Sequence, residues 1–413
     1  MLKRLSFLSS IIGIILLVLA IGWFIRYRNG ATPPVTPIDT NSGVTTNPGS
    51  QGAGSGSAST STVKVTVPPK KAFGPVADQE VAAYYPYADG SLIIVQPSGQ
   101  VMRISGTEGT LLSTLSISNL SYASFSRDGK KIVAVFGNPL NQEVSVFDTD
   151  QKSWSPVFIR PGSKPAWSPS GHRLAFLTED QLNTTISTID LNLSLPKIQD
   201  ILTLQGHDLT LQWKSDSELF LSEKPSAYAA SQLLAIDLKK KTVRPILRDR
   251  FGLDFLWDTN VQQGVVFEAV KNGPGGTMQL VGPDGLVTRK FSFTTLAEQK
   301  CLFDQTRVAS ATAQLSASGT VSSQTVRDLT PILICAVPKN TTRFLGATLP
   351  DDYLEKDLMT EDGVLEIDLS NGKVADRSPS VQEGVDAISI KATEEAIYFI
   401  NRYNNKLYRL LRS

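Results

Sequence analysis

Residues 165–177 of this 413-residue chain read PAWSPSGHRLAFL, which is an aromatic residue followed by a polar turn and then by an apolar stretch. Residues 122–135, YASFSRDGKKIVAV, and residues 211–221, LQWKSDSELFL, have the same form. Ser, Asp, Gly and Pro favour tight turns, and the apolar stretch after the turn has the length of one strand. Each copy therefore predicts two strands joined by a hairpin.

The aromatic residues of these copies recur at a nearly constant interval. Phe125, Trp167, Trp213 and Trp257 are separated by 42, 46 and 44 residues. A repeat of about 40–45 residues made of short strands is typical of a β-propeller blade, a four-stranded antiparallel sheet that packs on its neighbours through both faces. The chain is therefore predicted to be all-β, with the aromatic residue at the end of each first strand filling the gap between blades.

Seven positions occupy the aromatic place of the repeat: Tyr87, Phe125, Trp167, Trp213, Trp257, Phe303 and Ile390. We predict seven blades, with six or eight as alternatives. The interval between Phe303 and Ile390 is about two periods long. We assign it to one blade with insertions, and a further blade in that interval would make eight.

Within that long blade, residues 300–303, 332–337 and 364–368 are expected to be the first three strands. The stretch 309–323, rich in Ser, Thr and Ala, is interpreted as a loop. The final unit supplies only three strands before the chain stops. Propellers avoid an exposed edge by borrowing a strand from the other terminus, and residues 62–67, which alternate strictly, are predicted to close the ring.

The N-terminus carries Lys3 and Arg4, then an apolar run over residues 5–25, then Arg26. About 21 apolar residues suffice for one helix across a bilayer, whereas a cleaved signal peptide usually has an apolar run of about 7–15. Cleavage is the alternative, and residues 20–22 are the one weak match to a cleavage site. We predict an uncleaved, single-pass anchor with residues 1–28 as cytoplasmic tip and transmembrane helix.

Residues 29–61 are almost all Thr, Ser, Gly, Pro, Ala and Asn, a composition that cannot bury enough apolar surface to fold. We predict a disordered, flexible linker. Residues 62–413 are then the β-propeller domain. Because a short N-terminal tail normally stays in the cytoplasm, this domain is expected outside the cell membrane, in a protein of bacterial type.

Composition excludes several functions. The 40 Lys and Arg residues balance 39 Asp and Glu residues, so no net charge attracts nucleic acid. Two His and two Cys residues exclude a three-histidine or four-cysteine zinc site. No metal, cofactor or catalytic residue is predicted.

The motifs at Trp167 and Phe125 resemble the TolB-type, WD-like propeller repeat, in which Ser-Pro-Asp-Gly follows an aromatic residue. The resemblance covers two blades well and the others weakly, since the blades at Trp213 and Trp257 lack the Pro and Gly. It implies a propeller and no particular function. Similar repeats occur in periplasmic binding partners of envelope complexes and beside the hydrolase domain of prolyl-oligopeptidase-like proteases.

A hydrolase is not expected, because the predicted domain contains no Gly-x-Ser-x-Gly nucleophile motif and has no room for a further α/β domain. His172 and His207, in a hairpin turn and a loop between blades, are interpreted as solvated residues. Cys301 and Cys335 fall in strands that we expect to be adjacent. A cross-strand disulfide and two buried thiols are both compatible with this placement.

An acidic loop at residues 350–357 offers Asp351, Asp352, Tyr353, Glu355 and Asp357 as a partner-binding surface. Calcium binding is less favoured, since the regular spacing of a calcium loop is missing.

The sequence thus favours a membrane-anchored, extracytoplasmic binding or scaffolding module for an envelope protein, peptide or glycan. A propeller-type lyase or glycosidase with a site in the central channel, and an accessory subunit of a cell-surface or secretion complex, are the alternatives.

Overall fold

The computed structural model describes residues 71–412 apart from 107, 114, 140, 160–163, 305–330 and 380–383. The predicted anchor at 5–25, the linker at 29–61, the strand at 62–67 and the loop at 309–323 lie outside these ranges. Among the residues described, no helix is long and apolar enough to cross a membrane.

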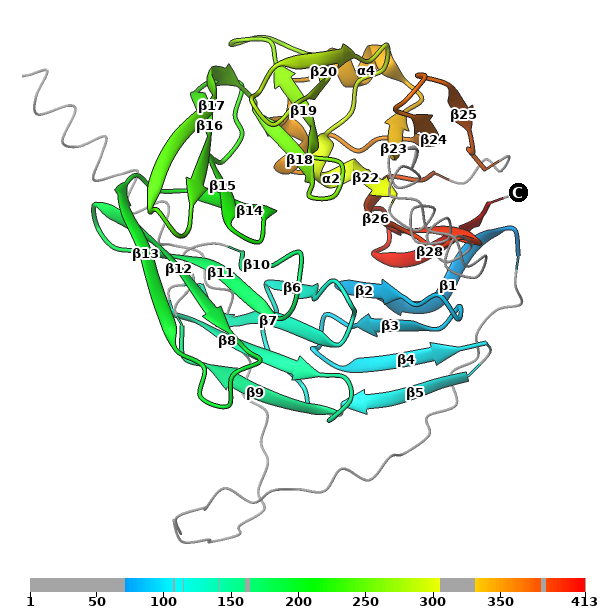
Figure 1. The fold of residues 1–413 in the computed structure, drawn as a ribbon. Helices are drawn as coiled ribbons and strands as arrows, with labels where there is room; N and C mark the ends of the chain where they lie inside the picture. Colours follow the sequence, from blue (N-terminus) through cyan, green and yellow to red (C-terminus); the bar gives the residue numbers. More distant parts are fainter. Residues whose placement is uncertain are drawn as a thin grey trace, which may run out of the picture. The chain divides into compact units, whose positions relative to one another are not determined.

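The described residues form seven four-stranded antiparallel sheets arranged around a central axis (Figure 1), which confirms the seven-bladed, all-β prediction. Blade 1 contains β2 (Ala83–Pro86), β3 (Leu92–Val95), β4 (Val101–Ser105) and β5 (Glu108–Ser113). Blade 2 contains β6 (Tyr122–Phe125), β7 (Lys131–Asn138), β8 (Asn141–Asp148) and β9 (Ser153–Val157). Blade 3 contains β10 (Ala166–Trp167), β11 (Arg173–Glu179), β12 (Asn183–Asp190) and β13 (Ile198–Gln205).

The other four blades follow the same plan. Blade 4 contains β14 (Leu209–Ser215), β15 (Glu218–Glu223), β16 (Ala230–Asp237) and β17 (Thr242–Phe251). Blade 5 contains β18 (Asp254–Asp258), β19 (Gln263–Ala269), β20 (Gly276–Val281) and β21 (Val287–Lys290). Blade 6 contains β22 (Cys301–Asp304), β23 (Ile332–Pro338), β24 (Asp362–Asp368) and β25 (Val374–Asp376). Blade 7 contains β26 (Ala387–Ala392), β27 (Ala396–Asn401), β28 (Lys406–Leu411) and β1 (Phe73–Glu80).

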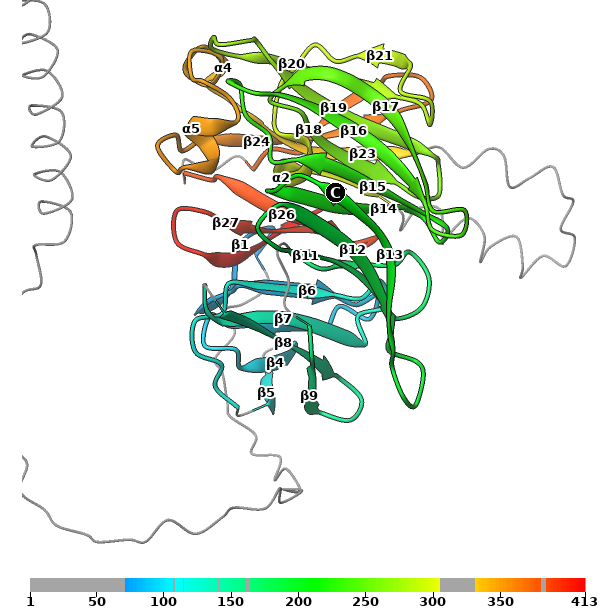
Figure 2. The ribbon, with the colours of Figure 1, turned by 90° about the vertical axis from the view of Figure 1, so that its left-hand side faces the viewer.

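Burial explains the apolar pattern of the middle strands. All four residues of β3 and all seven of β23 are buried, because each of these strands is covered by a neighbouring blade on both faces. The fourth strands of the blades lie at the rim and are largely exposed, as in β13 and β17. Figure 2 shows the blades from the side, with their strands twisted past one another.

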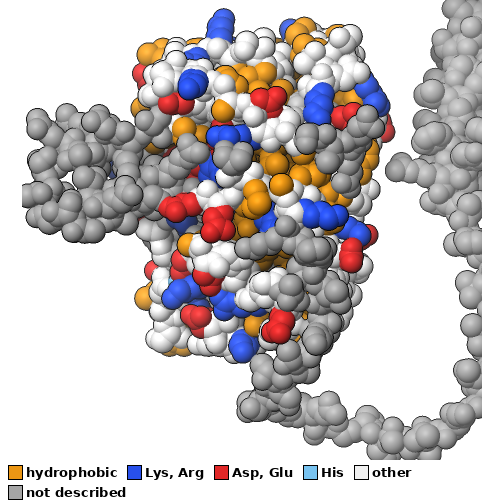
Figure 3. Space-filling model, turned by 90° about the vertical axis from the view of Figure 1, so that its right-hand side faces the viewer, with side chains coloured by type: hydrophobic (Ala, Val, Ile, Leu, Met, Phe, Trp, Pro, Cys, Tyr) orange, Lys and Arg blue, Asp and Glu red, His pale blue; other side chains and the backbone are white. Residues whose placement is uncertain are grey.

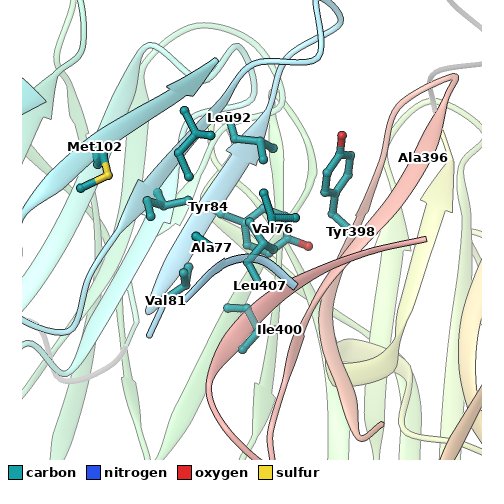
Figure 4. Close-up of a cluster of buried hydrophobic side chains, with 12 residues drawn as sticks. Val76, Ala77, Val81, Tyr84, Leu92, Met102, Ala396, Tyr398, Ile400 and Leu407 are labelled. Atoms are coloured by element: carbon teal, nitrogen blue, oxygen red, sulfur yellow. The ribbon is translucent and has the colours of Figure 1, made fainter. Parts of the chain in front are cut away.

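A strand from the N-terminal part of the chain closes the ring, as predicted, but this strand is β1 and not residues 62–67. The outermost strand of blade 7 is β1, which pairs with β28 from Phe73 opposite Leu410 to Glu80 opposite Lys406. The prediction that residues 62–67 complete this blade is therefore corrected. Val76 and Ala77 of β1 are buried together with Tyr84 and Leu407 in a core shared by blades 1 and 7 (Figure 4), and this burial stabilises β1 as the closing strand.

Blade 6 has the three first strands expected from the sequence. Between β23 and β24 it carries a segment, residues 339–361, that we call the insertion. This segment contains the short helices α4 (Thr341–Leu345) and α5 (Asp351–Leu354). A third short helix, α2 (Ala297–Lys300), leads directly into β22.

On the side of the molecule drawn in Figure 3, basic and acidic side chains are interspersed. This distribution agrees with the balanced charge of the sequence.

Candidate functional site

The first strand of each blade lines a central channel, and the repeat aromatic residues surround its inner part. A cavity of about 560 Å³, here called the inner cavity, is lined by the ends of these strands. Six aromatic residues take part in its lining: Tyr85, Phe125, Trp167, Trp213, Trp257 and Phe303. A volume of this size is typical of small-ligand sites.

The aromatic side chains also join the blades, as predicted. The indole N–H groups of Trp167, Trp213 and Trp257 donate to the backbone oxygens of Ser124, Ala166 and Lys214 in the preceding blades, at 3.1, 2.9 and 3.1 Å. Trp213 and Trp257 are only 5% and 8% exposed. Their ring faces are therefore occupied mainly by protein contacts.

Arg127 spans one end of the channel. It follows β6 in blade 2 and donates to the backbone oxygen of Pro169 in blade 3 at 3.2 Å. It also reaches Thr259 Oγ1 at 3.5 Å and Asn260 Oδ1 at 3.3 Å, both in blade 5. A bridge between blades 2 and 5 narrows the channel at this end.

A second cavity of about 540 Å³, here called the outer cavity, opens at the other end. It is lined by the beginnings of the first strands, including Tyr122 and Lys164, and by Leu354 of the insertion. The inner and outer cavities share Ala166, Gln212 and Glu298 as lining residues. The two cavities therefore follow one another along the channel, and Glu298 stands at their junction.

Two acidic residues meet at this junction. Asp254, at the start of β18, is buried, and its Oδ2 accepts the backbone N–H of Glu298 at 3.2 Å. Burial and the nearby charge of Glu298 raise the pKa of Asp254 to about 7. Glu298 is exposed to the channel. Desolvation by the surrounding protein raises the pKa of its carboxyl group, and the charge of Lys164 opposes that rise.

Lys391 lies on β26 and lines the inner cavity. Burial lowers the pKa of its ammonium group. Titratable groups with perturbed pKa values that line a channel are candidates for a functional site.

The insertion is fixed to the propeller at the outer cavity. Asp351 accepts hydrogen bonds from Ser226 Oγ at 2.7 Å and from the Ala227 N–H at 2.8 Å, both in blade 4. Asp352 accepts the N–H of Thr348 at 2.8 Å. The Asp351 bonds hold the insertion against blade 4, and the Asp352 bond fixes the turn of the insertion itself.

The five residues proposed from the sequence as a partner-binding surface thus divide into two groups. Asp351 and Tyr353 contact the propeller itself, Asp352 bonds to Thr348 within the insertion, and Tyr353 is 2% exposed. Glu355 and Asp357 are exposed. The sequence could not separate these groups, because all five residues are polar or amphipathic and adjacent.

A buried polar network centred on Lys300 contacts Tyr353 of the insertion through Asp386. The Lys300 ammonium group donates to Asp362 Oδ2 at 2.5 Å, to Asp386 Oδ1 at 2.7 Å and to Thr360 Oγ1 at 2.9 Å. The Tyr353 hydroxyl donates to Asp386 at 2.7 Å. Burial alone would lower the pKa of Lys300, but the charge of Asp362 holds it above the ordinary value, so the lysine stays charged.

The two cysteines lie next to this network. Cys301 on β22 is directly opposite Cys335 on β23, their Cα atoms are 4.2 Å apart, and a disulfide joins them. The bond ties the first strand of blade 6 to the second, one residue beyond Lys300.

Neither histidine lines the two cavities. His172 contacts Asp128 and Asn192 through its ring nitrogens, at 3.0 and 2.9 Å, in the turns of blades 2 and 3. Within the described ranges, no group of three or more His, Cys, Asp and Glu residues is arranged to hold a metal ion.

The sequence analysis missed Asp254, Glu298 and Lys391. The repeat itself could have predicted part of the channel lining. The residue just before the repeat aromatic lines the inner cavity in five blades: Pro86, Ala166, Gln212, Leu256 and Leu302. Glu298 and Lys391 are not placed by that rule, since a short helix positions the first and a bulge the second.

No protein-family model matches the chain, and no curated protein matches it in sequence. Solved structures share its fold. A manganese complex of oligogalacturonate lyase is 10% identical, with a TM-score of 0.54 over 86% of this chain and 96% of the lyase. The oligogalacturonate lyase of Vibrio parahaemolyticus is 7% identical, with a TM-score of 0.53 over 80% and 89%. TolB from Acinetobacter baumannii is 11% identical, with a TM-score of 0.35 over 79% and 61%. At these identities the likeness to the two lyases establishes a propeller fold and no activity.

Proposed function

We propose that this chain is a membrane-anchored, extracytoplasmic binding module. Its propeller receives a protruding chain end of an envelope protein, peptide or glycan through the mouth beside the insertion. The observation that carries the proposal is the fixed position of the insertion at the outer cavity. A loop on a rigid scaffold beside a preformed cavity is a typical ligand-binding arrangement.

Three contacts support a preorganised surface. Asp351 binds blade 4, Tyr353 binds Asp386 at the start of blade 7, and Leu354 lines the cavity itself. Because the side chains are already ordered, a ligand loses less free energy to loop ordering when it binds. The exposed Glu355 and Asp357 stand beside α5, where they can contact the rest of a partner.

The test is crosslinking of the full-length protein in its native membrane, followed by mass spectrometry of the captured partner. The variant Glu355→Lys/Asp357→Lys reverses two exposed charges on the insertion. The control variant Glu394→Lys/Glu395→Lys reverses two exposed charges in the β26–β27 turn, at the Arg127 end of the channel. We expect the first variant to lose a reproducible partner that the control retains. Equal capture by both variants would place the partner elsewhere.

An enzyme with its site in the channel is the second candidate, and the Asp254–Glu298 pair is the observation that favours it. A carboxyl group with a pKa of about 7 can exchange protons at neutral pH. Oligogalacturonate, named for the lyase neighbours, is the first substrate to test. Unsaturated products that form with the wild type, and at less than ~1% of that rate with Glu298→Gln, would support a lyase. No product formation would exclude oligogalacturonate as the substrate.

A further inference from the structure

Lys391 is aimed into the inner cavity by an irregularity of β26. Ile388 pairs with Ile400 and Lys391 pairs with Tyr398, so β26 contains one more residue than β27 between these two pairs. Within this bulge, Ser389 has a φ of 55°, which a residue other than glycine adopts only at a cost. The Tyr84 hydroxyl donates to the Ser389 oxygen at 2.6 Å and holds the bulge in place. Bulges beside functional sites often redirect a side chain in this way.

The charge of Lys391 is left uncompensated by the fold. Within the described part of the chain, its ammonium group has no carboxylate at ion-pair distance and makes no hydrogen bond. In the same part of the chain, the ammonium group lies over the Tyr85 ring, whose centroid is 5.8 Å from Nζ. Glu298 and Lys391 line the same cavity but form no ion pair. A partly buried ammonium group without a counter-ion is unfavourable, and an anionic ligand would relieve that cost.

The position of Lys391 along the channel, measured from the mouth beside the insertion, indicates which part of a ligand reaches it. Ser389 lines the outer cavity, whereas Lys391, two residues further along β26, lines the inner one. Two residues of a strand advance about 7 Å. A ligand that enters beside the insertion therefore meets Lys391 with its tip, after it has passed Glu298.

We propose that Lys391 binds the C-terminal carboxylate of a partner peptide whose last side chain packs into the aromatic part of the inner cavity. This inference rests on the proposed binding function and specifies its ligand. Among the described residues, the Glu298 carboxylate has no hydrogen bond or ion pair, and it lines both cavities, so it can accept a backbone N–H of the same peptide. A sugar ring cannot stack on Trp213 and Trp257, whose faces are almost fully covered, and the last side chain of the peptide contacts the half-buried Tyr85 and Trp167 instead.

The test measures binding of N-acetyl-L-phenylalanine and of its C-terminal amide to the full-length protein in detergent, by saturation-transfer NMR. The carboxylate is expected to bind at least tenfold more tightly than the amide. Lys391→Met should abolish this difference, and Lys391→Arg should retain part of it. Lys240→Met, at a lysine that is 77% exposed, is the control and should behave as the wild type. The melting temperature of each variant confirms that it is folded.

Three outcomes would overturn the proposal. The preference for the carboxylate could persist in folded Lys391→Met, or neither compound could bind to the wild type. Alternatively, galacturonate could bind in a Lys391-dependent manner while N-acetyl-L-phenylalanine does not, which would assign the site to an acidic glycan. Because no cellular partner is needed, failure of this inference is distinguishable from failure of the crosslinking experiment.

Discussion

The backbone N–H of Glu298 donates a 3.2 Å hydrogen bond to Oδ2 of Asp254, which brings two acidic residues together where the inner and outer cavities meet. Asp254 belongs to the first strand of blade 5, and Glu298 belongs to α2, which introduces blade 6. The pair thus depends on the packing of two blades. Its charge state affects the stability of the ring.

Asp254 makes stability depend on pH. Its folded pKa of about 7 exceeds the ordinary value of 3.8, so between these pH values the folded protein binds a proton that the unfolded chain has released. The contribution of this group to the free energy of unfolding is therefore largest near pH 4 and falls as the pH rises through 7. Asp254→Asn should be more stable than the wild type at pH 8, by on the order of 2 kcal/mol, and similar to it near pH 4. Melting temperatures across this range measure the difference, and a pH-independent gap between the two proteins would contradict the assignment.

Ring closure depends on β1. Ala77 is fully buried between blades 7 and 1, so Ala77→Asp places an unpaired charge in the core and should destabilise the propeller by about 3 kcal/mol or more. Asp78→Ala, at the adjacent exposed position, should change stability by less than ~0.5 kcal/mol. Deletion of residues 62–67 should leave the melting temperature unchanged. A large loss on that deletion would show that the earlier segment contributes to closure after all.

Removal of Lys300 from the buried polar network should lower the free energy of unfolding. Lys300→Met leaves Asp362 buried without its counter-charge, while Asp386 keeps Arg402, and loss of one partner of a buried pair typically costs about 3–5 kcal/mol. Lys240→Met, at an exposed ion pair, should cost less than ~0.5 kcal/mol. Denaturant unfolding compares the two variants. Equal stability of the two variants would mean that Lys300 does not form the buried ion pairs seen in the structure.

The disulfide should stabilise blade 6. Reduction, or Cys301→Ser/Cys335→Ser, opens a loop with a sequence separation of 34 residues and should lower the free energy of unfolding by roughly 2–4 kcal/mol. Peptide mapping of the native protein without reductant should recover the two cysteines in one linked fragment. Recovery of both as free thiols would instead support the alternative of two buried cysteines.

The sequence contained enough information to predict the blades and too little to predict the site. The spacing of Phe125, Trp167, Trp213 and Trp257 predicted the period, because each aromatic residue fills the same gap between blades. The closing strand was misplaced, since strict alternation at residues 62–67 is a local pattern. Burial of Val76 and Ala77 in a shared core depends on contacts with residues more than 300 positions away.

What the sequence by itself determined is the repeating architecture, since aromatic residues followed by polar turns and apolar strands recur at a nearly constant interval and need no long-range information. Only the tertiary structure decided that Glu298 stands beside Asp254, that a bulge turns Lys391 into the channel, and that Tyr353 and Asp351 hold the insertion in place. The pKa of a carboxyl or an ammonium group depends on burial and on charges from other blades. These quantities exist only once the ring has closed.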